Sequence, residues 1–196
     1  MQVRHRIAIL GCILFIGSGT LCSMLVVQAG DTTVGLAVYA ATFLNLIAVP
    51  EKRIPLVEND STHLTVEARN PGSTTPLDST VVTTRSDGTY SGVTLSIEAG
   101  TYDFTVKGYS HLRRKKRDVA FTEGSTIDFT DGGTNKLLCG DVNSTDGDNK
   151  VNGIDLSLIV AGLLGSVERL DLNQDGKVNG IDLSNAVSNL NVTGDT

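Results

Sequence analysis

The 196-residue chain contains no tryptophan, few other aromatic residues and only three cysteines. So few rings argue against a sugar-binding surface built from aromatic side chains. Cys12 and Cys22 fall inside an apolar N-terminal segment, which leaves Cys139 without a disulfide partner in the rest of the chain. Something other than disulfides must therefore stabilise the small domains. Cys139 is interpreted as an ordinary thiol near a domain junction, with a tether to another chain or cofactor as the alternative.

Residues that would support catalysis are also sparse. His63 and His111 are isolated, so no triad of histidine metal ligands is visible. The acidic residues of the middle region are scattered, with no nucleophile motif beside them. A carboxylate pair could still form in space, because glycosidases position theirs through the fold. We expect that the chain is not an enzyme, with a small carbohydrate-active enzyme as an alternative.

Positive charge is scarce near the C-terminus. From Asp141 onward nine acidic residues face three basic ones, a net charge of −6 in a chain whose total is also −6. Such an excess repels itself unless cations are bound, and it excludes nucleic acid as a partner because phosphate binding needs Lys and Arg. The one basic run, residues 113–117, is expected to be a solvated strand end or loop, with binding to an anionic polymer or an acidic partner surface as the alternative.

The N-terminal segment indicates export. Arg4 and Arg6 precede an apolar run over residues 7–27, and Val27 and Ala29 are small residues at the −3 and −1 positions of a cleavage site. This pattern predicts a signal peptide over residues 1–29 and a secreted or cell-surface protein. The alternative is an uncleaved anchor, since the run could just span a bilayer. In that case the N-terminal segment is the only part expected to contact a membrane.

Residues 31–131 show the alternation of short β-strands. Apolar side chains recur at every second position in several stretches, and Gly-containing turns separate them. The expected strands cover residues 33–39, 43–49, 63–68, 93–97, 102–106 and 127–129. Strands at this spacing predict an antiparallel β-sandwich of about seven strands. The stretches 86–90 and 98–106 resemble the small sandwich modules of the carboxypeptidase-regulatory and collagen-binding-B types, which implies a spacer role.

After a short joint over residues 132–139, the chain repeats itself. Lys150-Val-Asn-Gly-Ile-Asp-Leu-Ser157 recurs unchanged at residues 177–184. An identity of eight residues at a spacing of 27 indicates a duplicated unit. The short joint is expected to keep the sandwich and the duplicated region, residues 140–196, close together.

The second copy has the spacing of an EF-hand-like calcium loop. Oxygen-bearing side chains stand at loop positions 1, 3, 5, 9 and 12, and Gly176 at position 6 permits the sharp turn. Calcium prefers six to eight oxygen ligands, so alternate side chains and a backbone carbonyl must converge on the ion. The expected ligands are Asp171, Asn173, Asp175, the carbonyl of Lys177, Asn179 and Asp182.

The first copy is three residues longer and allows two registers. One begins at Asp141 and bulges before Asp148; the other begins at Ser144 and has the standard length. We favour the longer register because residues 140–143 parallel residues 170–173. The expected ligands are Asp141, Asn143, Asp146, Asp148, the carbonyl of Lys150 and Asp155. The first site is expected to be the weaker of two calcium sites, with Asn149 in place of the glycine.

One amphipathic helix is expected after each loop and none before it. Leu156, Ile159, Val160 and Leu163 form an apolar stripe that ends at Gly165, and Leu183, Ala186, Val187 and Leu190 repeat it. Two loop-plus-helix units near the end of an exported chain resemble a dockerin, the calcium-dependent module that binds cohesin domains. The resemblance implies a β-sandwich followed by a small all-α dockerin, two calcium ions, a cohesin partner and a link to polysaccharide catabolism or cell-surface assembly.

The same resemblance assigns partner contacts to loop positions 10 and 11. These are Gly153 and Ile154 in the first copy, and Gly180 and Ile181 in the second. Many relatives have a Ser-Thr-like pair there, so the identity of the cohesin is not implied. Because the two copies match, either face could dock after a half-turn. The alternative to a cohesin-binding adaptor is a calcium-stabilised surface or matrix protein with no cohesin partner.

Overall fold

The computed structural model describes residues 25–29, 32–36, 42–54, 59–144 and 147–196, with side chains from residue 42 onward. Residues 1–24 of the expected signal segment lie outside the described residues. Strands β1 (Leu25–Ala29) and β2 (Thr32–Leu36) form a separate two-stranded antiparallel sheet. Of the strand expected over residues 33–39, the described residues 33–36 pair with β1 and take no part in the sandwich. In the described part of the chain, no helix has the length and apolar character needed to cross a membrane.

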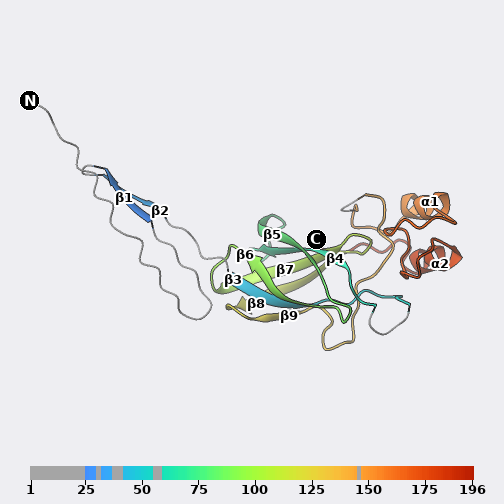
Figure 1. Cartoon of the computed structure of the whole chain (residues 1–196), viewed down its shortest axis with the longest axis horizontal. Helices are drawn as coiled ribbons and strands as arrows, with labels where there is room; N and C mark the ends of the chain where they lie inside the picture. The colour runs from blue at the N-terminus through green and yellow to red at the C-terminus, as the bar shows by residue number, and fades with distance from the viewer. Residues whose placement is uncertain (1–24, 30–31, 37–41, 55–58, 145–146) are drawn as a thin grey trace, which may run out of the picture.

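Seven strands form the expected β-sandwich (Figure 1). One sheet has the order β5-β4-β7-β8 and is antiparallel throughout. The other has the order β6-β3-β9, in which β3 pairs antiparallel with β6 and parallel with β9. The bounds are β3 Thr42–Ile47, β4 His63–Arg69, β5 Pro76–Thr83, β6 Thr89–Leu95, β7 Gly100–Gly108, β8 Arg114–Phe121 and β9 Thr126–Asp128. The prediction of a sandwich is confirmed, with one parallel pair that the sequence did not indicate.

The core lies between the two sheets and follows the expected alternation. Leu44 and Leu46 of β3 are buried against Phe104 and Val106 of β7 in one cluster. Phe104 and Phe121 meet edge to face, with ring centroids 5.6 Å apart. Such packing of apolar faces is the main stabilising contribution in a domain without disulfides.

Two strands of the sandwich were not expected from the sequence. Strand β5 is an edge strand with mostly exposed or half-buried side chains, so its sequence carries little alternation. Strand β8 includes most of the basic run, which was interpreted as a strand end or loop. Acidic groups of the same chain neutralise much of its charge, because Arg114 and Lys116 both pair with Asp131. The ion pairs with the chain's own carboxylates weaken the case for an acidic partner surface at this run.

Two nine-residue helices follow the sandwich, α1 (Gly153–Ala161) and α2 (Gly180–Ser188). Asn152 and Asn179 cap their N-termini, each in a capping box with the acidic residue three positions later. α1 ends at Gly162 and not at the expected Gly165. The described segments just before each loop contain no α-helix, as expected.

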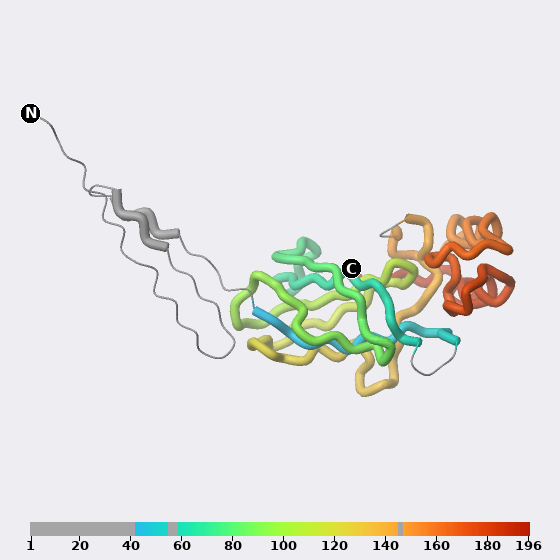
Figure 2. The backbone as a smooth tube through the Cα atoms, viewed as in Figure 1, coloured from blue at the N-terminus to red at the C-terminus, as the bar shows by residue number. Residues whose placement is uncertain are grey.

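The helical pair lies at one end of the sandwich, and the connection between them is packed (Figure 2). Leu137 is buried in the sandwich core, and its amide donates to the carbonyl of Val49 at 2.8 Å. After α2 the chain returns to the sandwich, where the Asp195 amide donates to the carbonyl of Arg113 at 2.9 Å. The segments before and after the helical pair are therefore both held to the sandwich by backbone hydrogen bonds.

Candidate metal-binding loops and exposed helix faces

The second loop is closed by the carboxylates at its two ends. The oxygens of Asp171 accept the amides of Asp175 at 3.1 Å and Gly176 at 2.8 Å. At the far end, Asp182 accepts the amides of Leu172 and Asn179, both at 2.8 Å. Both carboxylates are buried, and burial is the largest influence raising the pKa of Asp171. A buried carboxylate of this kind gains stability from a nearby cation.

The turn of this loop requires unusual backbone angles. Gly176 has φ +89° and Gln174 has φ +57°, so the chain enters the left-handed region twice around Asp175. The first loop has the same pattern around Asp148, with φ +65° at Gly147 and φ +63° at Asn149. The two loops therefore share one backbone shape across their turns, despite the difference in length.

The first loop is closed in the same way, with Asp141 in the place of Asp171. Asp141 accepts the amides of Asp148 at 3.1 Å and Asn149 at 2.9 Å. Asp155 accepts the amides of Val142 and Asn152, both at 2.8 Å, as Asp182 does in the second loop. This geometry supports the longer register that begins at Asp141. Asp146, one of the expected ligands, lies outside the described residues.

The oxygens present suit a hard cation. Among the residues that the structure describes, no three His, Cys, Asp or Glu side chains gather into a metal cluster, so amide and carbonyl oxygens would have to contribute. Asn143 offers one, since its side-chain oxygen is buried and has no hydrogen-bond partner. A buried acceptor without a partner is costly unless a ligand satisfies it. The donor set fits calcium, and the individual ligand roles remain predictions.

The two repeats are joined to each other by matched hydrogen bonds. After α1, Leu164 donates to the carbonyl of Val178 at 2.9 Å; after α2, Asn191 donates to the carbonyl of Val151 at 2.8 Å. Each pair of positions is related by the repeat spacing of 27. Val151 and Val178 are fully buried. Each loop therefore pairs with the segment that follows the other repeat's helix, in an approximately two-fold arrangement.

The expected apolar stripes are present on both helices, and only part of each stripe is buried. Ile159 and Ala186 are buried, but Val160 and Leu163 of the first stripe and Val187 and Leu190 of the second are exposed. Two short helices have too little partner surface to cover a stripe of two turns. The exposed fractions agree between repeats: 58% and 48% for Ile154 and Ile181, 50% and 49% for Val160 and Val187, and 39% and 38% for Leu163 and Leu190.

The inner surface differs between the repeats. Leu170, just before the second loop, packs on α1 so closely that a Cβ added to Gly162 would lie 2.4 Å from its Cδ1. The matching residue before the first loop is Gly140, where an added Cβ would lie 3.2 Å from the Cα of Ala186 on α2. The residue before the first loop therefore has no side chain to pack on the opposite helix, whereas Leu170 packs against the end of α1. The repeats thus match on the outside and diverge where the chain enters from the sandwich.

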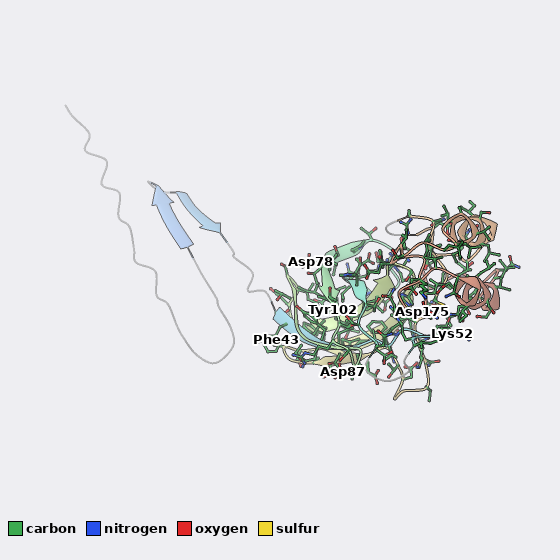
Figure 3. All side chains as sticks on the ribbon, turned by 45° about the vertical axis from the view of Figure 1, so that its right-hand side comes forward. Phe43, Lys52, Asp78, Asp87, Tyr102 and Asp175 are labelled. Carbon is green, nitrogen blue, oxygen red and sulfur yellow. The ribbon has the colours of Figure 1, made fainter. Side chains whose placement is uncertain are left out.

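Two charged residues of the junction were not expected from the sequence. Glu51 accepts the Cys139 amide at 2.9 Å and also the side-chain amide of Asn189. Lys107 of β7 reaches Asp141 with 2.9 Å between Nζ and Oδ2. Both lie outside the repeated motif, and Lys107 occupies a strand position that alternation assigns to solvent. Figure 3 shows Asp175 of the second loop where the helical pair meets the sandwich.

Residues 139–191 match the family model of the dockerin type I domain. Two solved structures are also similar, both interface mutants of a type II cohesin–X–dockerin complex from Acetivibrio cellulolyticus. The C-terminal interface mutant has a TM-score of 0.57 at 20% identity and covers 78% of this chain and 97% of the other. The N-terminal interface mutant has a TM-score of 0.51 at 21% identity, with coverage of 79% and 96%. No curated protein matches the chain.

Proposed function

We propose that the chain is an exported, non-catalytic adaptor that binds a cohesin through residues 139–191, the part that matches the dockerin type I domain. The sandwich formed by strands β3 to β9, residues 42–128, acts as its spacer, and residues 132–139 connect it to the dockerin domain. Residues 1–29 direct export as a signal peptide or anchor. The assembly belongs to polysaccharide breakdown or to attachment at the cell surface.

The matched pair of exposed apolar faces carries this proposal. Six large aliphatic side chains stand on α1 and α2 and just after their C-terminal ends, in three pairs related by the repeat, and each member of a pair has nearly the exposure of the other. An exposed apolar patch of this kind marks a protein interaction site. Gly153 and Gly180 begin the two helices with open space around them, which leaves room for a partner beside Ile154 and Ile181.

Each loop is proposed to hold one calcium ion, two in all. When bound, the ion supplies a fixed positive charge that neutralises the buried carboxylates of its loop. The chain itself prepares the geometry: Asp141 and Asp171 organise the turns, and Asp155 and Asp182 tie each loop to the N-terminus of its helix. The orientation of Ile154 and Ile181 then depends on the closed loops before them.

The experiment measures binding of the full exported chain to purified cohesin domains of both types, in calcium and in chelator. Binding is expected in calcium and not in chelator. Ile154→Ala or Ile181→Ala alone should leave the dissociation constant within about threefold, because the other face can dock, whereas the double change should abolish binding. Leu77→Ala is the matched control, since Leu77 lies on strand β5 of the sandwich and is 50% exposed.

Loss of binding from one single change would reject two equivalent faces. Calcium uptake without binding to any cohesin would instead favour the calcium-stabilised surface or matrix protein. Hydrolysis of a polysaccharide by the purified chain would reject the non-catalytic role.

A further inference from the structure

We propose that Lys107 of the sandwich serves as a built-in counter-cation for the first loop, so that this loop keeps its closed form without calcium and binds the ion more weakly than the second. The inference rests on the proposed calcium binding by the loops. It concerns a residue outside the dockerin domain and does not involve the cohesin.

The contacts of Lys107 are directed and buried. The side chain is 5% exposed, and Nζ lies 2.9 Å from Oδ2 of Asp141, whose own side chain is fully buried. Nζ also lies 2.6 Å from the carbonyl of His111 and 2.9 Å from that of Gly108. These oxygens come from both sides of the junction, so the ammonium is held where the sandwich meets the first loop.

Asp141 is the residue through which this charge acts. Its two oxygens accept the amides of Asp148 and Asn149 and so define the turn of the loop. The backbone also closes tightly over it, since a Cβ on Gly147 would lie 2.2 Å from its carboxylate oxygens. A buried carboxylate that organises a loop needs a positive partner, and the ammonium is one that is always present.

Among the residues that the structure describes, the second loop has no equivalent ion pair. Asp171 accepts the same two amides, but none of the ion pairs among the described residues includes it. Arg53 is near enough to interact electrostatically with Asp171 without an ion pair between them. Closure of the second loop therefore depends more on calcium.

Two consequences follow from the same charge. Without calcium, the ammonium offsets the Asp141 carboxylate, so the amides at 148 and 149 stay protected. With calcium, the ammonium stands beside a proposed ligand and repels the incoming ion, which lowers affinity at the first site by at least about tenfold relative to an uncharged side chain.

The test uses the full chain and three variants. Lys107→Met removes the charge and keeps a similar length, Lys107→Arg keeps the charge, and Lys115→Met is the matched control. Lys115 is also a buried sandwich lysine, 6% exposed, but its partner is Asp103, which is distant in sequence from both loops. Hydrogen exchange follows amides 148–149 and 175–176 in chelator and in calcium, and calorimetry gives the two calcium affinities.

In chelator the natural chain should protect amides 148–149 and lose protection at 175–176. Lys107→Met should lose protection at 148–149 in chelator, regain it in calcium, and bind the first ion at least about tenfold more tightly. Lys107→Arg and Lys115→Met should behave as the natural chain.

Several results would overturn the inference. One is that Lys107→Met keeps its protection of amides 148–149 in chelator, and another is that its calcium affinity at the first site is unchanged. A third is that the variant does not fold even in calcium, because the ion should replace the lost charge. If neither loop of the natural chain binds calcium, the proposed function fails, and the exchange at 148–149 still reports separately on the ammonium.

Discussion

Replacement of Ile159 by alanine should make the dockerin domain depend on calcium for folding. Ile159 is fully buried in a small cluster of seven buried side chains. Truncation of a buried isoleucine to alanine costs about 2–5 kcal/mol, because it removes apolar contacts and leaves a cavity. A domain of about 50 residues has a free energy of unfolding of roughly 3–8 kcal/mol. The substitution therefore removes a large part of the stability of the domain.

Calcium should restore part of this loss. At about 100 times its dissociation constant, one ion adds roughly 2.7 kcal/mol to the free energy of unfolding. The Ile159→Ala variant should then be largely unfolded over α1 and α2 in chelator and folded in calcium, with the sandwich unaffected in both. The chain has no tryptophan for fluorescence, so hydrogen exchange by mass spectrometry is the suitable assay, with the β4 amides as an internal reference.

The control is the same substitution on the exposed side of the same helix. Ile154 is 58% exposed, so Ile154→Ala should change the free energy of unfolding by no more than about 0.5 kcal/mol. Equal protection of α1 in the two variants in chelator would refute the reasoning, because it would mean that the buried cluster does not stabilise the domain.

Three further predictions concern single sites. Gly147→Ala should reduce the number of calcium ions bound in calorimetry from two to one. The backbone φ at Gly147 is +65°, and the added Cβ would meet the Asp141 carboxylate oxygens. Two ions bound at natural affinity would contradict this. Hydrogen bonds, led by that from Lys116, lower the pKa of Asp131 from 3.8 to about 2. Its contribution to stability should therefore be complete above about pH 4 and lost as the pH falls towards 2, and an NMR titration midpoint near 4 would argue against these bonds. Burial raises the pKa of the Cys139 thiol and so slows its reaction with thiol reagents. If calcium keeps the loops closed over it, these reagents should label Cys139 at least about tenfold faster in chelator than in calcium. Equal rates would show that its burial is independent of the loops.

Much of the local structure follows from short-range pattern. Residues 171–182 place oxygens at fixed spacing around Gly176, and the repeated octapeptide contains both the capping asparagine and the acidic residue that closes each loop. Apolar residues at every second position predict the strands at 63–68 and 102–106. These features depend on neighbours within about a dozen residues, which is why inspection of the chain finds them.

Two features were not predicted from the sequence because they depend on which elements pack beside them in the folded chain. Strand β8 is a run of charges that forms a strand because β7 pairs with it and acidic groups lie beside it. The sequence predicts the apolar stripes of the helices but not which of their side chains are covered, and Val160 and Val187 are exposed. Periodicity reports that a helix has an apolar face, and only the packing of other elements shows whether that face is covered.

The chain alone therefore specifies the loops, the helix starts and the alternating strands, because these depend on residue types at short separations. The junction is different. Lys107 meets Asp141 across 34 positions of sequence, and Glu51 meets Cys139 across 88. Contacts at such separations arise from the path of the backbone through the sandwich. The three-dimensional fold therefore determines where the dockerin domain lies against the sandwich and which charge stands beside its first loop.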